Sequence, residues 1–277
     1  MMSEARRVWN PATKGRGMRF GDLRRMSLDD YVASAPRDAF WFFLHIPKTA
    51  GSSFSTELSR VVKPYHNIHA DAAQRGIGYD AAVNLALDEF LARPDLQGFR
   101  SASGHLLHPM TRKMWEHVPG MEMVTFLRDP EARVVSDYRY QRTPMHPGHE
   151  AFRQRFPTLE SFVEDPASQN RIAHFIGDVR ADHAELMARL ERDFAFVGLV
   201  EMYPFSFSTL FALMGHPGHT PRERVRATPD TPETAVELTP RLRRRIAEVN
   251  SLDSDLVART REILMPHAEA WQAARAD

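Results

Sequence analysis

The feature that most constrains the fold is an almost wholly apolar run followed at once by a turn of small and polar residues. Residues 40 to 46 read FWFFLHI, and residues 47 to 53 read PKTAGSS. A short apolar run of this kind is typical of a central strand that helices cover on both faces. Apolar residues then recur three and four apart from Ser52 to Val61, which indicates an amphipathic helix. The sequence therefore predicts a strand, a tight turn and a helix in direct succession.

Strands and helices continue to alternate along the rest of the chain. Further strands are predicted at residues 98–103, 121–127 and 194–200, and helices at 79–92, 108–117, 131–142, 182–192, 241–249 and 253–270. Alternation of this kind produces mostly parallel sheets. We therefore expect an α/β fold, with a P-loop-like open, mostly parallel β-sheet flanked by helices.

The domain organisation follows from length and periodicity. A chain of 277 residues fits one domain, which we place at residues 38 to 277. Residues 1 to 37 lack clear periodicity and are predicted to form an N-terminal tail or flap, with one short helix around Ser27 to Ala35. The stretches 143–157 and 215–237, rich in Pro and His, are interpreted as loops. They are candidates for ligand recognition, with solvated connections as the alternative.

Charge and composition exclude several classes of protein. Basic and acidic residues both number 36, so no overall charge draws the chain to nucleic acid or to an anionic membrane. The absence of cysteine excludes disulfides, thiolate nucleophiles and Cys-ligated zinc. The sequence contains neither an apolar run of about 18 residues nor the apolar centre of a secretory signal. We expect a cytoplasmic protein with no membrane span and no nucleic-acid partner.

The turn after the first strand has the composition of an anion-binding site. Ala50 and Gly51 are small enough to let an anion approach the backbone N–H groups, and the hydroxyls of Thr49, Ser52 and Ser53 add donors. Lys48 brings a positive charge, and the positive end of the helix dipole faces the same point. Because Lys48 precedes the small residues, the order differs from the P-loop of Mg²⁺-dependent NTPases. A plain strand-to-helix connection with a serine cap is the alternative.

A second candidate anion site follows the strand at 121–127. Arg128 stands at the carboxyl end of that strand, Asp129 and Pro130 are suited to start a helix, and Arg133 and Ser136 are one helical turn apart. Ligands of open α/β sheets gather at the carboxyl ends of the strands. Lys48 and Arg128 are therefore expected to hold two phosphates of one nucleotide, although an Arg-Asp-Pro corner alone is as often a salt-bridged helix start.

Together these motifs resemble those of a known family. HIPKTAGSSF (45–54) and LRDPEARVVSDY (127–138) are similar to the two donor-binding motifs of the carbohydrate-type sulfotransferases, sulfotransferase family 2, which includes the heparan sulfate O-sulfotransferases. FAFVGLVEMYPFSFSTL (194–210) resembles a later strand and helix of that family, and SQNRIAHFIG (168–177) resembles its Gln/Asn–Arg segment more loosely. Two departures are Ala50, where glycine is common, and the lack of an Arg-Lys-Gly element near the C-terminus, which disfavours the cytosolic aryl branch.

The resemblance implies a nucleotide sulfuryl donor and assigns residues to it. The donor would be 3′-phosphoadenosine 5′-phosphosulfate (PAPS), with its 5′-phosphosulfate in the turn 45–54, Lys48 at the bridging oxygen, and its 3′-phosphate on Arg128 and Ser136. The partner would be a hydroxyl-bearing acceptor, carbohydrate-like or other. The sequence determines neither the acceptor nor the oligomeric state.

A general base is needed to take the acceptor's proton, and a histidine suits this role near neutral pH. His105, just after a predicted strand, resembles the Gly-His element that carries the base in heparan 2-O-sulfotransferases. His108 is the second candidate, and a helix-cap or core role is the alternative for both. Four H-x-x-H pairs also raise the question of a metal, but Pro and Gly interrupt two of them and no carboxylate stands at ligand spacing, so we expect no metal.

Two other functions remain open at this point. One is an ATP-dependent small-molecule kinase with a degenerate phosphate loop, and the other is an inactive nucleotide-binding module. A kinase would need a Mg²⁺-holding Ser or Thr with an acidic partner, and neither stands at a recognisable position. The presence of Lys48, Arg128 and Ser136 together weighs against an inactive module.

Overall fold

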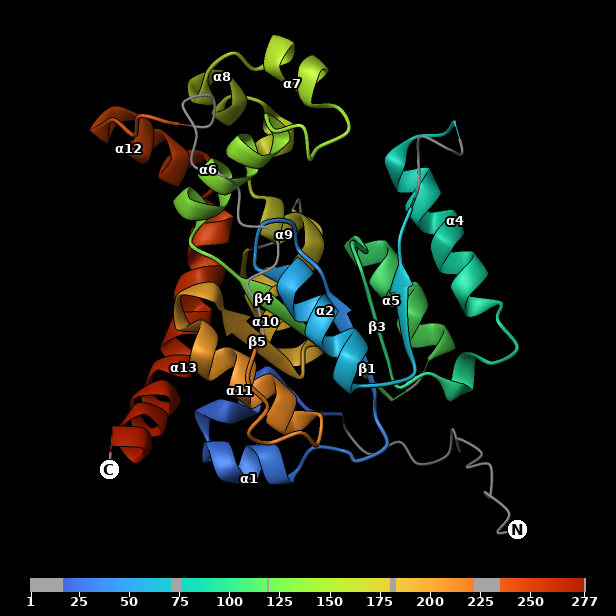
Figure 1. Ribbon diagram of the computed structural model, residues 1–277. Coiled ribbons are helices and arrows are strands. Elements are labelled where there is room, and N and C mark those ends of the chain that lie inside the picture. Colours follow the sequence, from blue (N-terminus) through green and yellow to red (C-terminus); the bar gives the residue numbers. More distant parts are fainter. Residues whose placement is uncertain (1–16, 71–75, 119, 180–182, 222–234, 277) are drawn as a thin grey trace.

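The protein is an α/β structure built on one parallel sheet (Figure 1). The computed structural model describes residues 17–70, 76–118, 120–179, 183–221 and 235–276. Its strands are β1 (Phe40–Leu44), β2 (Tyr65–Ile68), β3 (Ser101–Gly104), β4 (Met121–Leu127) and β5 (Phe196–Leu199). They lie in the order β2-β3-β1-β4-β5, and every pairing between neighbours is parallel. The predicted fold class is confirmed.

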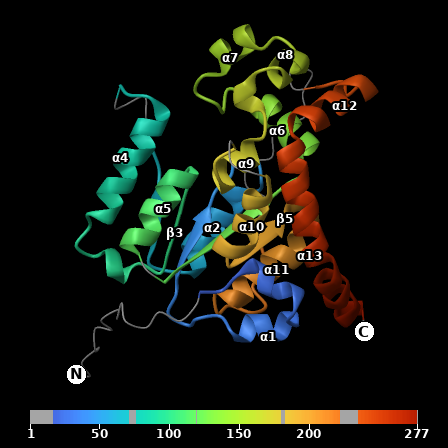
Figure 2. The same ribbon diagram turned by 180° about the vertical axis from the view of Figure 1, so that it is seen from behind.

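Helices cover both faces of this sheet. The helices and 3₁₀ segments are η1 (Phe20–Arg24), α1 (Leu28–Ala33), α2 (Gly51–Val61), α4 (Tyr79–Leu91), η2 (Leu96–Gly98), α5 (His108–His117), α6 (Pro130–Gln141), α7 (His149–Arg155), α8 (Leu159–Val163), η3 (Pro166–Ser168), α9 (Arg171–Ile176), α10 (His183–Asp193), η4 (Val200–Met202), α11 (Tyr203–Leu213), α12 (Pro240–Val249) and α13 (Ser251–Ala276). Helices α2 and α11 lie in front of the sheet in Figure 1, whereas α5 and α10 come to the front in Figure 2.

The centre of the sheet is buried because β1 lies between β3 and β4. All residues of β4 are buried, as are four of the five in β1. Phe54 of α2 packs edge-on against Phe126 of β4, with ring centroids 5.3 Å apart, and its ring centroid is 5.5 Å from that of Phe211 in α11. Aromatic pairs of this kind add packing energy beyond the burial of their area. The first and second motifs therefore start from two neighbouring strands at the centre of the sheet.

Strand β2 escaped the sequence analysis. Of its four residues only Ile68 is fully buried, while Tyr65 and His66 are half-buried and Asn67 is exposed. An edge strand of this composition carries neither an apolar run nor a clear alternation of apolar and polar residues. Its position is decided by backbone pairing with β3.

Two sequence interpretations need correction. The segment 1–37 was assigned to a tail or flap with one short helix. That helix is confirmed as α1, and the hydroxyl of its N-cap Ser27 accepts from the Asp30 N–H, but Phe20, Leu23 and Tyr31 are buried in the main core. Residues 1–16 lie outside the described residues. The stretch 143–157 was interpreted as a loop, yet it contains α7, whose Phe152 is buried. Of the second predicted loop, residues 222–234 are outside the described residues.

Helix α7 is stabilised because it packs into a second hydrophobic cluster. This cluster joins α6, α7, α8 and α12 and is separate from the core around the sheet; its buried members are Val134, Tyr138, Phe152, Phe156, Leu159, Phe162, Val163, Leu242 and Ile246. In Figure 1 these helices lie beyond the carboxyl edge of the sheet, above the ends of β1 and β4. They therefore form a wall beside the position where both candidate anion sites begin.

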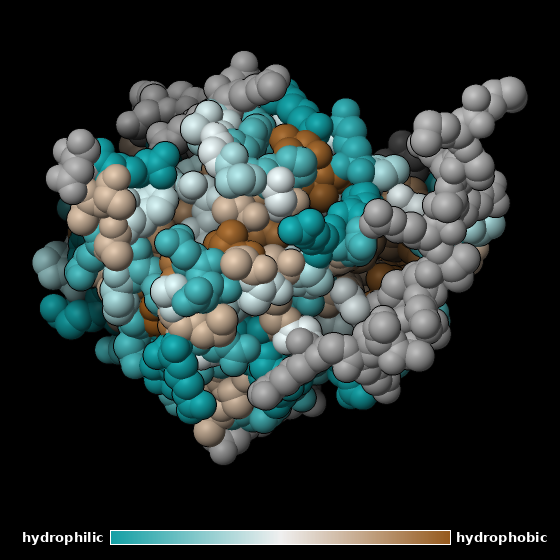
Figure 3. All heavy atoms as spheres, turned by 90° about the horizontal axis from the view of Figure 1, so that it is seen from below, coloured by the Kyte–Doolittle hydropathy of each residue, from teal (hydrophilic) through white to brown (hydrophobic). Residues whose placement is uncertain are grey.

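Figure 3 shows the molecule from below, on the side away from α6, α7, α8 and α12 of Figure 1. On this side the described surface is mostly hydrophilic, with hydrophobic residues in small groups between polar ones. Within the described ranges, none of the helices combines the length and the apolar character required to cross a bilayer.

Candidate functional site

The turn between β1 and α2 has an unusual backbone. Lys48 and Ala50 both adopt left-handed conformations, with φ of 68° and 62°. This region is rare for residues with a side chain, and such strain tends to occur at ligand sites. Alternation of ordinary and left-handed conformations turns successive N–H groups toward one point, which makes an anion-binding concavity. Helix α2 starts at Gly51, and Ser52 and Ser53 lie half-buried in its first turn.

Thr49 contributes differently from the sequence expectation. Its side chain is completely buried, and its hydroxyl donates to the carbonyl oxygen of Ile46 at 2.9 Å. The hydroxyl therefore stabilises the turn from inside. What Thr49 can offer to a ligand is its backbone N–H.

The two predicted anion sites are in direct contact. The guanidinium of Arg128 donates a hydrogen bond of 3.2 Å to the carbonyl oxygen of Lys48. The ammonium of Lys48 lies over the ring of Tyr140 in α6, 3.9 Å from its centroid. Ser136 is half-buried one helical turn before Tyr140, so both are on the same face of α6. Lys48, Arg128 and Ser136 are thereby brought to one region.

Arg133 is separate from this group, although sequence spacing placed it beside Ser136. Its side chain is fully buried and donates to the carbonyl oxygen of Ser168 at 3.0 Å. Its Nε lies 3.9 Å from the carboxylate of Asp253, which is also fully buried. Residues three apart on a helix differ by about 60° in direction, which is enough for one to face the interior and the other the surface.

Asp253 connects this buried arginine to helix α9. Its carboxylate accepts hydrogen bonds from the N–H groups of Ile172 and Ala173, at 3.1 and 2.8 Å. Burial raises the pKa of Asp253 and lowers the pKa of Arg133, and the attraction between their charges opposes both shifts. The network fixes the first turn of α9, which carries Arg171.

The hydrogen bond of the His105 ring determines which of its nitrogens carries the proton. Its Nδ1 lies 2.6 Å from the carbonyl oxygen of His45. Because a carbonyl only accepts, Nδ1 must carry the proton, and Nε2 is left with its lone pair. Burial, and secondarily the charges of His69 and Arg171, lower the pKa of His105 to about 4, against the opposing effect of its bond to His45. The ring is thus neutral near pH 7 and able to accept a proton at Nε2.

His108, the alternative base, faces another helix. Its Nε2 is in hydrogen-bond contact with the guanidinium of Arg189 in α10. A guanidinium only donates, so this contact occupies the lone pair of Nε2. Burial, together with the nearby arginines, also lowers the pKa of His108. The two candidate bases are therefore in different environments.

In each of the other three H-x-x-H pairs, at least one histidine contacts a side chain outside the pair. His66 stacks on Phe90, His146 packs edge-on against Tyr140, and His219 is 3.1 Å from the carboxylate of Glu57. In the part of the chain that the structure describes, no three His, Asp or Glu side chains are grouped as metal ligands would be.

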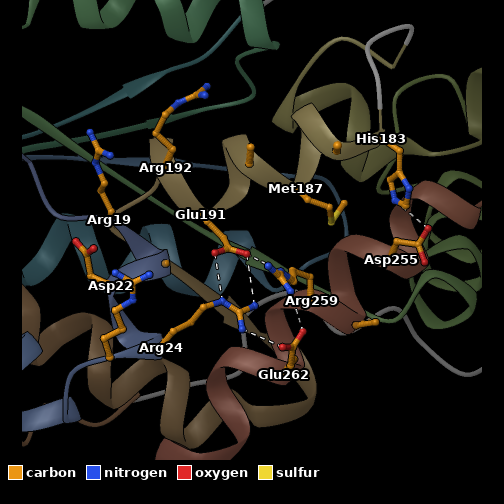
Figure 4. Close-up of a pocket in the computed structure, with 15 residues that line it drawn as sticks. Arg19, Asp22, Arg24, His183, Met187, Glu191, Arg192, Asp255, Arg259 and Glu262 are labelled. Atoms are coloured by element: carbon orange, nitrogen blue, oxygen red, sulfur yellow. Dashed lines mark hydrogen bonds and ion pairs between the residues drawn. The ribbon is translucent and has the colours of Figure 1, made fainter.

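A cavity with a volume of about 850 Å³ lies elsewhere, between η1, α10 and α13 (Figure 4). Arg24 lies between Glu191 and Glu262, at 3.2 and 2.9 Å, and Arg259 contacts the same two carboxylates. None of the predicted site residues lines it. Its ion pairs hold the N-terminal segment against the C-terminal helix.

Sequence reasoning missed two residues of the site. His45 stacks on His105, and Tyr140 contacts Lys48. His45 stands within the first motif and Tyr140 two residues beyond the second, so their proximity in sequence was the only available signal. Their contacts depend on the packing of β3 and α6.

Comparisons with known proteins give limited information. No protein-family model matches the sequence, and no curated relative matches it. Among solved structures, the chain is similar to the mouse sulfotransferase SULT7A1 complexed with PAP, at 13% identity and a TM-score of 0.42, over 82% of this chain and 69% of that one. It is also similar to a sulfotransferase from Alicyclobacillus acidocaldarius, at 17% identity and a TM-score of 0.36, over 92% and 96% of the two chains. At these scores the function must be argued from this chain's own geometry.

We predict that Asp253→Ala lowers the free energy of unfolding by about 3–5 kcal/mol, because it removes one of the two carboxylates that face the buried Arg133 and also the acceptor of two α9 N–H groups. Urea denaturation measures this. Asp255→Ala is the control on the same helix: its carboxylate pairs with His183 at the surface, and its loss should cost less than about 1 kcal/mol. Equal effects of the two substitutions would contradict the role of the buried network.

Proposed function

We propose that this protein is a sulfotransferase that moves a sulfuryl group from PAPS to the hydroxyl of an acceptor. The observation that carries the proposal is the hydrogen bond from Arg128 to the Lys48 carbonyl oxygen. It joins an anion-binding turn to a second cationic strand end, as a nucleotide with phosphates at two positions requires. A ligand with phosphate groups on both its 3′ and 5′ oxygens suits two such sites in contact.

The residues divide between the two ends of the donor. The backbone N–H groups of residues 48–53, the hydroxyls of Ser52 and Ser53, and the ammonium of Lys48 would bind the 5′-phosphosulfate. Arg128 and Ser136 would bind the 3′-phosphate, as the resemblance implies. Arginine suits this task because its planar guanidinium offers several donors to phosphate oxygens.

In the proposed reaction the sulfuryl group passes directly from the donor to the acceptor, so the protein mainly positions the reactants and stabilises charge. The acceptor oxygen forms a bond to sulfur while the bond from sulfur to the bridging phosphate oxygen breaks, and the acceptor's proton must leave. In this proposal Lys48 stabilises the negative charge that develops on the departing phosphate. Nε2 of His105 takes the proton, since its lone pair is available when Nδ1 donates to His45. The neutral state of His105 at pH 7 is compatible with this role.

Calorimetry with adenosine 3′,5′-bisphosphate beside ATP and Mg²⁺ tests the donor class. We expect the bisphosphate to bind at least tenfold more tightly than ATP, because only the bisphosphate has a 3′-phosphate for Arg128 and Ser136. Preference for ATP would favour a kinase, and binding of neither nucleotide would exclude both enzyme classes.

Lys48→Ala should lower kcat by about 10²-fold or more, because it removes the cation that offsets charge on the leaving phosphate. The affinity for the bisphosphate should fall by less than about tenfold, since the backbone donors of the turn remain. Transfer of labelled sulfate to a panel of hydroxyl acceptors provides the rate. Lys113→Ala is the control, because Lys113 pairs with Asp88 at the surface of α5. A kcat for Lys48→Ala equal to that of the control would remove Lys48 from the mechanism.

His105→Ala should lower kcat by about 10²–10⁴-fold while bisphosphate affinity is kept. His117→Ala, at the exposed end of α5, is the control. Because the pKa of His105 is about 4, kcat/KM for the donor should fall at acidic pH only as the pH approaches 4. It should change little between pH 7.5 and 5.5, where a base with the ordinary histidine pKa of about 6.5 would lose most of its activity. An acid limb centred near 6.5 would mean that another group is the base.

A further inference from the structure

His45 is enclosed by parts of the site that the sequence motifs do not connect. Its imidazole lies tilted against the His105 ring, with centroids 4.1 Å apart and planes 31° apart, and it stacks on Phe43 at 5.8 Å. Its ring also lies against Gly51, the first residue of α2. A Cβ atom at Gly51 would come within 1.9 Å of Cδ2 and 2.2 Å of Nε2 of His45. The ring therefore fills the space between the candidate base and the start of the anion-binding helix.

The backbone of His45 adds two further contacts to the same strand end. Its N–H donates to the carbonyl oxygen of Gly104 at 3.0 Å, and its own carbonyl oxygen accepts from Nδ1 of His105. These two hydrogen bonds fix the position of the strand end that carries His105 and determine which nitrogen of its ring carries the proton. The ring of His45, which lies against that of His105, restricts the tilt of the His105 ring about its hydrogen bond.

Stacking also bears on the charge that forms during transfer. When Nε2 of His105 takes a proton, the ring becomes an imidazolium in a largely desolvated position, and the positive charge of Arg171 acts against it. An aromatic face within about 6 Å attracts a cation, by roughly 0.5–1 kcal/mol and more when water is excluded. The ring of His45 is such an aromatic group in contact with the ring of His105.

We infer that His45 is a positioning residue: its ring holds His105 in one orientation beside the turn and stabilises the imidazolium that His105 forms on taking the acceptor's proton. The inference rests on the proposed function for the origin of that proton. It assigns to the first motif a task besides donor binding, because the strand end that leads into the turn also orients the base. His45 itself exchanges no proton in this scheme.

Three variants distinguish the effect of the aromatic ring of His45 from the effect of its size. His45→Leu keeps an apolar side chain of similar size but removes the aromatic face, and should lower kcat by about tenfold or more while KM for the donor changes less than about twofold. His45→Phe keeps an aromatic face and should restore kcat to within about threefold of the unmodified protein. His66→Leu is the matched control, since His66 also stacks on an aromatic ring, that of Phe90 at 4.7 Å, but outside the site.

A second measurement does not depend on activity. Long-range ¹H–¹⁵N spectra should show one set of His105 ring signals with Nδ1 protonated, both in the unmodified protein and in His45→Phe. In His45→Leu we expect exchange-broadened or doubled His105 signals, because the ring is no longer held. This readout tests His45 even if the protein transfers no sulfuryl group, so failure of the proposed function and failure of the inference are distinguishable.

Three results would contradict the inference about His45. Unchanged His105 signals in His45→Leu would show that the ring does not hold the base. Equal losses of kcat in His45→Leu and His45→Phe would rule out the aromatic face as the cause, and a loss confined to the donor KM would assign His45 to donor binding instead.

Discussion

The hydrogen bond from Arg128 to the Lys48 carbonyl oxygen is the contact on which the candidate site depends. It joins the ends of β1 and β4, which are neighbours in the sheet but 80 residues apart in sequence. Parallel pairing brings both strand ends to one edge, and the strained turn at Lys48 exposes the carbonyl to the arginine. Without this geometry, a lysine in a turn and an arginine at a helix start would be two unrelated local features.

The candidate base belongs to the same edge for the same reason. Leu44 pairs with Gly104 in β3, so the next residues, His45 and His105, leave the sheet side by side. Their rings are in contact, and Nδ1 of His105 donates to the carbonyl oxygen of His45. Because β1 lies between β3 and β4, its carboxyl end meets the base on one side and the arginine on the other. The middle strand thus organises both halves of the proposed chemistry.

Other charged groups stabilise the fold by connecting its helices. Arg133 and Asp253 tie α6 to α9 and α13 in a buried network, and Arg24 and Arg259 share two carboxylates around the cavity of Figure 4. Buried pairs such as the first are costly to break, because either partner left alone is an unpaired charge in the interior. The chain therefore uses arginine in two ways, and local sequence does not distinguish them: Arg128 and Arg133 stand in the same motif, one at the site and the other in the core.

The sequence by itself determined the fold class, most helices and four of the five strands, because apolar runs and helical spacing are local properties of the chain. It also singled out Lys48, Arg128, Ser136 and His105, since turn composition and strand-end position can be identified without coordinates. The fold alone decided what depends on distant partners. Strand β2 exists through its pairing with β3, α7 through a hydrophobic cluster assembled from four helices, and the burial of Thr49 and Arg133 through the packing around them. The contacts of His45 with His105 and of Lys48 with Tyr140 are of the same kind, because a side chain's neighbours across the sheet are set by register and packing and not by its own sequence.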